Sequence, residues 1–340
     1  MKTQRIILFG LLVNVLVAQN PITVSNVPGV SADYNNLQTA LDAAPDSSTI
    51  YVYASSSSYG DINISKPTFL YGAGMFPDTP GPITSKLGNV TFTTSQTDSS
   101  HGSILSGFVI TSEISISNGL ENIIIERNIG WNIVLNQTNN ISIINNRLSV
   151  SSTNTTVITL NSCTNTNIIN NYIRRSLSGG FVTNYYIIIG SDSFIVNNYF
   201  TIENYSTYDH YISGSNNIIE NNIFNDDAAW GSISLSQFYN NMSAMEAPLG
   251  QNNNVGSGNI VGVPLFITTS FGDQNYYGLD WGSPGLEAGT DGTDLGIQGG
   301  FYVFSNAYMP PLPYVQQLQV PAVVPLNGSI NVKITGKSHN

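Results

Sequence analysis

The stretch Ile143-Ile144-Asn145-Asn146 recurs along the chain as Ile168-Ile169-Asn170-Asn171 and Ile195-Val196-Asn197-Asn198. The shared pattern is an isoleucine followed three positions later by Asn or Gly. It occurs six times, as Ile104 with Gly107, Ile125 with Asn128, Ile143 with Asn146, Ile168 with Asn171, Ile195 with Asn198 and Ile219 with Asn222. Its last position advances by 21, 18, 25, 27 and 24 residues. An elastic repeat of this length is typical of a solenoid.

The residue types indicate which solenoid this is. Asn and Gly accept a positive φ more readily than other residues, so their column predicts one left-handed corner in each repeat. The isoleucine column suits a strand with an inward side chain. Two positions after the corner stands a second, mostly apolar column, namely Val109, Gly130, Leu148, Ile173, Phe200 and Phe224. This order predicts an all-β fold, a parallel β-helix, in which Asn side chains stacked about 4.8 Å apart hydrogen-bond along the axis.

Composition restricts the partners. Charged residues make up 9% of the 340 residues and the net charge is −11, whereas a usual chain has about a quarter of its residues charged. Asn, Ser, Thr and Tyr must therefore form the surface, which suits sugars, and the negative charge argues against nucleic acid. Because Cys163 is the only cysteine, stability must come from stacking and not from internal disulfides.

The two ends of the chain differ from its middle. Residues 1–18 have the pattern of a cleavable secretory signal peptide, with Lys2 and Arg5 before an apolar run that is too short for a transmembrane span. We therefore expect a secreted, extracellular or cell-surface protein. Residues 304–340 are predicted to form a Pro-rich linker and a β-prone tail, with Asn327-Gly328 as a hairpin signal.

Residues 34–44 favour a capping helix, because the apolar residues from Leu37 to Ala44 have helical spacing and Pro45 follows. The order "Leu-Gln-Thr-Ala-Leu-Asp-Ala-Ala", "Ser-Ser-Thr-Ile-Tyr-Val-Tyr" and "Ile-Asn-Ile-Ser-Lys-Pro-Thr-Phe-Leu-Tyr-Gly-Ala-Gly" resembles the start of the pectin-lyase-like family of right-handed parallel β-helix proteins. With the repeat, it predicts one β-helix domain over residues 19–303, with regular coils over about 100–227 and a closing turn at 282–300. The resemblance implies the fold and not the activity, because this fold carries lyases, hydrolases and adhesins.

Most of the charge between residues 160 and 230 lies shortly after the predicted corners, on one edge of the coils. We interpret this edge as a carbohydrate site, with aromatic rings that stack on sugars and Arg or acidic groups that bind hydroxyls. The candidate binding residues are Arg174, Glu203, Tyr205, Tyr208, Asp209, His210, Tyr211 and Trp230. The candidate catalytic residues are Asp226, Asp227 and Arg175, because two carboxylates serve as acid and base in glycoside hydrolysis. The alternative is that all of these are ordinary solvated loop residues.

The resemblance also shows what is missing for catalysis. Pectin hydrolases of this fold carry Asn-Thr-Asp, Asp-Asp, Gly-His-Gly and Arg-Ile-Lys in that order, and here only Asp226-Asp227 matches. The lyases need a Lys or Arg base, commonly with calcium, and no Lys occurs between residues 87 and 332.

Closely spaced acids in a Gly-rich turn, Glu287, Asp291 and Asp294, are candidate calcium ligands, with a solvated turn as the alternative. For the whole chain we predict non-catalytic binding of an extracellular or cell-surface polysaccharide. One alternative is a polysaccharide lyase or glycoside hydrolase, and the other is a structural or adhesive module with protein partners. The sequence predicts no oligomeric state.

Overall fold

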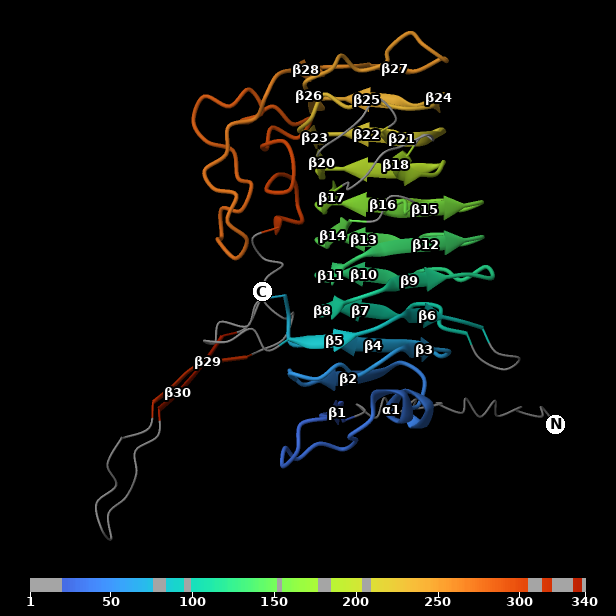
Figure 1. Ribbon diagram of the computed structural model, residues 1–340, viewed down its shortest axis with the longest axis vertical. Helices are drawn as coiled ribbons and strands as arrows, with labels where there is room; N and C mark the ends of the chain where they lie inside the picture. Colours follow the sequence, from blue (N-terminus) through green and yellow to red (C-terminus); the bar gives the residue numbers. More distant parts are fainter. Residues whose placement is uncertain are drawn as a thin grey trace, which may run out of the picture.

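The computed structural model is a tall stack of parallel coils (Figure 1). It describes residues 20–75, 84–94, 99–151, 155–176, 185–203, 209–304, 314–319 and 333–337. The predicted signal peptide, and most of the predicted linker and tail, lie outside these residues. The predicted class is confirmed: the chain is an all-β, right-handed parallel β-helix with a helix at its N-terminal end. No helix in the described ranges is both long and apolar enough to cross a membrane.

Three parallel sheets form the sides of the stack. The first sheet has eleven strands in the order β1 (Ile22–Val24), β2 (Ser48–Val52), β4 (Thr68–Tyr71), β7 (Ile104–Ser106), β10 (Ile124–Glu126), β13 (Ser142–Ile144), β16 (Thr166–Ile169), β19 (Ser193–Val196), β22 (Ile218–Glu220), β25 (Gln237–Tyr239) and β27 (Val255–Ser257). The second sheet has nine strands, β5 (Ser85–Leu87), β8 (Phe108–Ile110), β11 (Ile129–Gly130), β14 (Arg147–Val150), β17 (Tyr172–Ser176), β20 (Tyr199–Glu203), β23 (Ile223–Phe224), β26 (Met242–Ser243) and β28 (Ile260–Val261). The third sheet has eight strands, β3 (Ile62–Ile64), β6 (Val90–Phe92), β9 (Glu113–Ile116), β12 (Asn132–Asn136), β15 (Ile158–Asn161), β18 (Tyr185–Ile189), β21 (Asp209–Ser215) and β24 (Ile233–Ser234). The parallel coils therefore extend on both sides of residues 100–227.

The inward isoleucine column is present from the second instance of the repeat onward. Ile125, Ile143 and Ile168 pair with one another on successive coils and are fully buried. The column continues through Ile195 and Ile219. Each strand alternates inward and outward side chains, so this column builds a continuous apolar core along the stack.

The first instance of the repeat is displaced by one residue. Leu105, and not Ile104, pairs with Ile125 and is buried. Phe108 and Ile110, and not Val109, are likewise the buried residues of β8. The reason is that Gly107 occupies the left-handed position of its corner, whereas the Asn that ends each later instance stands one position further on.

The left-handed position itself is therefore one residue earlier than predicted. Positive φ angles of 50° to 56° fall on the residue before the predicted one, in Arg127, Asn145, Asn170, Asn197 and Asn221. The following asparagines begin the turn into the second sheet and are almost fully buried. The prediction that these asparagines are the left-handed residues was therefore wrong. Their side chains point inward and bond to one another.

That structure is an asparagine ladder, which confirms the predicted amide stacking. It comprises Asn128, Asn146, Asn171, Asn198, Asn222, Asn241 and Asn259, and each Nδ2 donates to the next Oδ1 at 3.0 or 3.1 Å. The same Oδ1 atoms accept the backbone N–H of the preceding ladder residue at 2.8 to 3.1 Å. The ladder satisfies buried polar groups at one corner through seven coils.

A short helix closes the N-terminal end of the stack. Helix α1 (Leu37–Ala43) begins after Asn36, whose Oδ1 accepts the backbone N–H of Thr39 at 2.9 Å. Its residues Leu37, Ala40 and Leu41 are buried against the core. The helix therefore covers the apolar end of the first coils, as predicted for residues 34–44.

The chain does not close the solenoid near Gly300. After β28, residues 262–304 return along the outer face of the second sheet (Figure 1). The left-handed asparagines of the corners hold this segment, because Asn170 Nδ2 donates to the carbonyls of Ile297 and Gly299 at 2.9 and 2.8 Å. Stacked rings of Tyr172 and Tyr199, 5.4 Å apart, pack beneath it.

The tail contributes a separate pair of strands. Strand β29 (Tyr314–Gln319) pairs antiparallel with β30 (Lys333–Lys337). The predicted turn at Asn327-Gly328 lies between them, outside the described residues.

Candidate functional site

The predicted edge contains a buried ion pair. Arg175 on β17 lies with its Nη1 3.2 Å from Oδ1 of Asp209 on β21, and neither side chain has any exposed surface. Because Ile173 points inward, Arg175 two residues later does so as well. Neither residue can contact a substrate on the outside, so the proposed catalytic role of Arg175 and binding role of Asp209 do not fit. Their pairing instead neutralises two charges inside the stack.

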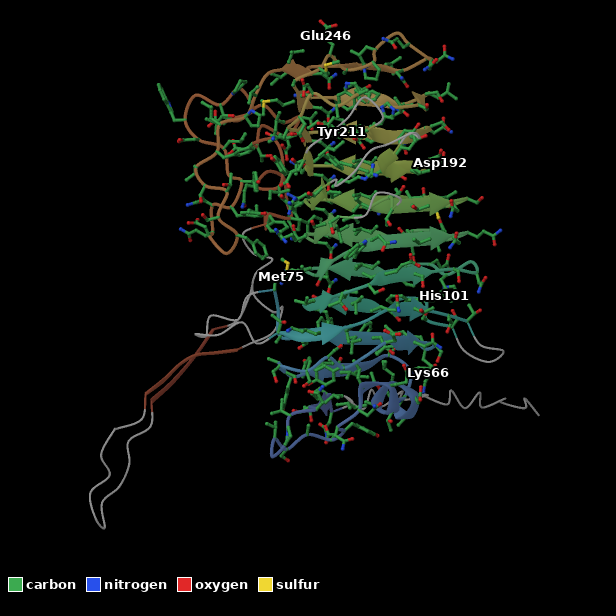
Figure 2. All side chains as sticks on the ribbon, viewed as in Figure 1. Lys66, Met75, His101, Asp192, Tyr211 and Glu246 are labelled. Carbon is green, nitrogen blue, oxygen red and sulfur yellow. The ribbon has the colours of Figure 1, made fainter. Side chains whose placement is uncertain are left out.

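Two of the aromatic residues predicted to stack on sugars, Tyr211 and Trp230, are also inside. Tyr211 is fully buried and Trp230 is 7% exposed, and Figure 2 labels Tyr211 within the stack. Their rings lie 4.9 and 4.5 Å from the ring of Phe224. Both residues belong to the core, although Trp230 is one of the residues that line a pocket near the end of the stack. With so little exposed surface, they do not fit the predicted role of platforms for sugar rings.

The two candidate catalytic carboxylates have different environments. Asp226 is half-buried, and its Oδ2 accepts the backbone N–H of Ile202 at 2.6 Å. Its backbone N–H donates to Tyr211 Oη, whose hydroxyl donates to the carbonyl of Asp226. Burial raises the pKa of Asp226. Asp227 beside it is exposed. Asp226 therefore fixes the connection between coils through its backbone and its carboxylate.

Arg174 and Glu203 remain at the surface. They form an ion pair between neighbouring strands β17 and β20, with 27% and 45% of their side-chain surfaces exposed. His210 is half-buried and stacks on Tyr186 with ring centroids 5.3 Å apart, and burial lowers the pKa of its imidazole. Tyr205 and Tyr208 lie outside the described residues.

The predicted calcium ligands are engaged in turns. Asp294 Oδ1 accepts the backbone N–H of Glu287 at 2.9 Å, and Asp291 Oδ1 accepts the backbone N–H and hydroxyl of Thr293 at 3.1 and 2.7 Å. Across the described ranges, no group of three or more His, Cys, Asp or Glu side chains is arranged to hold a metal ion. The structure does not gather these acids into a calcium site.

A different pocket lies where the second and third sheets meet, lower in the stack. Its volume is about 420 Å³. The residues that line it are polar except for Trp131, whose side chain is 36% exposed. Trp131 stands between β11 and β12. The lining residues are Asn89, Thr111, Ser112, Glu113, Trp131, Asn132 and Thr155.

Hydrogen bonds between coils fix the polar side chains around this ring. Asn132 Nδ2 donates to Glu113 Oε2 at 2.9 Å. Ser112 Oγ donates to Asn89 Oδ1 at 2.7 Å. These contacts join three successive coils, so the amide, hydroxyl and carboxylate groups are held in place before any ligand arrives.

A column of outward residues runs from this pocket towards the exposed part of the predicted edge. Gly130 pairs with Leu148, and Leu148 with Ile173. The residues that follow them, Trp131, Ser149 and Arg174, therefore stand in one outward column on three successive coils, with about 4.8 Å between coils. Arg174 and its partner Glu203 thus continue the surface that begins at Trp131. Sequence reasoning missed Trp131, although its place directly after the inward Gly130 column could have marked it as outward.

The fold and this surface define a parallel β-helix protein with an aromatic and polar pocket on its side. No protein-family model matches the chain, and no curated protein matches it either. Membership of the pectin-lyase-like family therefore stays a prediction.

Proposed function

We propose that this chain is a secreted or cell-surface β-helix protein that binds a polysaccharide without cleaving it. The observation that supports this best is the exposed ring of Trp131 above a prearranged set of polar groups. Sugars have an apolar face and a rim of hydroxyls, so an aromatic ring beside amide and carboxylate groups suits them.

The charge of the pocket favours a neutral sugar. Among the described residues that line it, Glu113 is the only charged one, and its carboxylate would repel a uronic acid. Arg174 is the nearest cation in the outward column, and it already pairs with Glu203. The proposed ligand is therefore a neutral polysaccharide lying along the column from Trp131 towards Arg174.

Two features of the predicted catalytic set support binding without cleavage. Arg175 is buried and paired. Asp226 uses its carboxylate to accept a backbone N–H. Neither group is available as acid or base at the Trp131 pocket.

The test is Trp131→Ala with Trp281→Ala as the matched control, because Trp281 is 91% exposed on the segment after β28. At 36% exposure, a ring of about 250 Å² can lose about 90 Å² of contact with water, or about 2 kcal/mol at about 25 cal/mol/Å². We expect Trp131→Ala to weaken binding by up to about 30-fold. The measurement is binding to a panel of neutral and acidic polysaccharides, with reducing and unsaturated ends assayed in parallel.

Binding that survives Trp131→Ala but not Trp281→Ala would move the site elsewhere. Release of reducing or unsaturated ends, abolished by Asp227→Asn, would favour the lyase or hydrolase alternative. No binding to any polysaccharide would favour the structural module.

A further inference from the structure

The two ends of the stack are closed to different extents. At the N-terminal end, every sheet has its outer edge paired. The side chain of Gln38 on α1 bonds both backbone groups of Asn63 on β3, at 2.8 and 3.1 Å. Tyr34 N donates to the carbonyl of Thr23 on β1 at 3.1 Å, and Tyr59 N donates to the carbonyl of Lys86 on β5 at 2.9 Å. No strand edge is left open there among the described residues.

At the C-terminal end, the described residues cover only the third sheet. Leu235 N, next to β24, donates to the carbonyl of Asn252 at 2.9 Å. By contrast, β27 and β28 are the last strands of their sheets, and no strand of the described chain pairs with their outer sides. Open edges of this kind are templates for another strand.

The backbone direction on β27 shows which groups face outward. Val255 N donates back to the carbonyl of Ser236 at 3.0 Å, and the carbonyl of Ser257 accepts Asn240 N at 3.1 Å. In a parallel pair, alternate residues direct both their backbone groups to the same side. The N–H and C=O of Gly256, between these two, therefore point off the end of the stack.

The side chains at this end are almost uncharged, and exposed apolar residues stand among the polar ones. Val255 and Val261 are 56% and 60% exposed. A pocket of about 320 Å³ lies beside them, with Met245 and Leu249 among its lining residues. From Ala228 to Gly272 the only Asp, Glu, Lys, Arg or His is Glu246, which Figure 2 shows at the top of the stack. The usual charged guards of an edge strand are missing.

These observations favour a second copy of this chain as the partner that pairs with the open edge of β27. The chain has a net charge of −11, so copies repel each other over most of their surface, and this end is where the repulsion is least. Among the described strands, β28, β29 and β30 also have an open outer edge. The pairing of β27 with the same edge on another copy is self-complementary, so one two-fold contact uses the same uncharged strand on both copies. An antiparallel pair centred on Gly256 would let the two glycines exchange both backbone hydrogen bonds, as in a hydrogen-bonded pair of an antiparallel ladder.

We propose that two copies of this chain associate end to end through the outer edges of β27, across a two-fold axis at Gly256. The closed N-terminal end stops the pairing at two copies. This interface is independent of the Trp131 pocket.

The test is the mass of the full chain in solution over a concentration range of about 1 to about 200 µM. The monomer mass is 36.6 kDa, and we expect the measured mass to approach twice this value. Val255→Lys places a charge on the interface in each copy and should weaken association at least about tenfold. The matched control is Phe194→Lys. Phe194 is 41% exposed and lies in the same column of the same sheet, connected to Val255 through Ile218 and Gln237. This control should leave association unchanged.

A second measurement is hydrogen exchange at the backbone amide of Gly256. In the dimer we expect slowed exchange at Gly256 that returns to a fast rate in Val255→Lys. A monomer at all concentrations overturns the proposal, whether its Gly256 amide exchanges fast or is protected by another segment of the chain. A dimer that Val255→Lys leaves intact also overturns it, because the interface then lies elsewhere.

Discussion

Removal of one rung from the asparagine ladder should cost far more in the middle of the stack than at its end. Asn171 Nδ2 donates to the carbonyls of Ile143 and Ile169 at 2.7 and 3.0 Å and to Asn198 Oδ1 at 3.0 Å, while its Oδ1 accepts two bonds from Asn146 at 2.8 and 3.0 Å. The change Asn171→Ala leaves the buried N–H of Asn146 without this acceptor, which costs about 1–3 kcal/mol, and each further bond contributes about 1 kcal/mol. We expect a loss of about 3–5 kcal/mol in the free energy of unfolding.

The matched control is Asn259→Ala at the last rung. Asn259 is half-exposed and accepts the same two bonds from Asn241 at 3.1 and 3.0 Å. Water can replace its amide, so the expected loss is about 1 kcal/mol or less. The assay is urea unfolding followed by circular dichroism. Equal losses in the two variants would refute the reasoning, because the stabilisation would then not depend on buried amide bonds.

Two further predictions concern the charged residues of the predicted edge. Asp209→Asn should leave Arg175 buried beside a neutral partner and lower the free energy of unfolding by about 3–5 kcal/mol. In the same assay, Glu203→Gln at the exposed pair with Arg174 should lower it by less than about 1 kcal/mol. Similar losses in the two variants would contradict the structural role of the buried pair. Burial raises the pKa of Asp226 above its ordinary 3.8, so the folded state binds the proton more tightly and stability falls as pH rises from about 3.8 through the raised pKa. Asp226→Asn should remove this fall and increase stability at about pH 7; an unchanged slope of stability against pH would show that Asp226 is not the group responsible.

The repeat predicted the coils because their chemistry is local. An apolar β-branched residue and a nearby Asn recur at almost every corner, and neighbouring coils then pair wherever these residues are in phase. The predicted register was wrong only at the first instance of the repeat. There Gly107 occupies the left-handed position that the first residue of the pair occupies in later coils, so the inward column is displaced by one residue. The different roles of the two residues in each Asn-Asn pair could not be predicted either. The first Asn bonds the returning segment, as Asn170 bonds the carbonyls of Ile297 and Gly299, 127 and 129 positions away.

The candidate site was harder to predict for a different reason. Charge counts placed Arg174 and Arg175 on one edge, but strand alternation sends only Arg174 outward. Tyr211 and Trp230 look like sugar platforms in sequence, yet residues of three coils bury them together. The sequence did not mark Trp131 as a binding residue, because a single aromatic ring indicates a site only when polar groups lie beside it. Here strand register brings Glu113 and Asn132 together next to Trp131.

Helix α1 closes one end of the stack and open strands form the other, and this difference suggests the order in which the coils fold during synthesis. Synthesis delivers the N-terminus first, so the closed end is complete while later coils are still being made. Neighbouring ladder residues are 18 to 27 positions apart, and each new coil finds a finished strand edge to pair with soon after it is made. Each finished coil presents the edge on which the next one pairs, and the last such edge is that of β28 at Val261. The exposed end of the folded protein is therefore the edge that formed last.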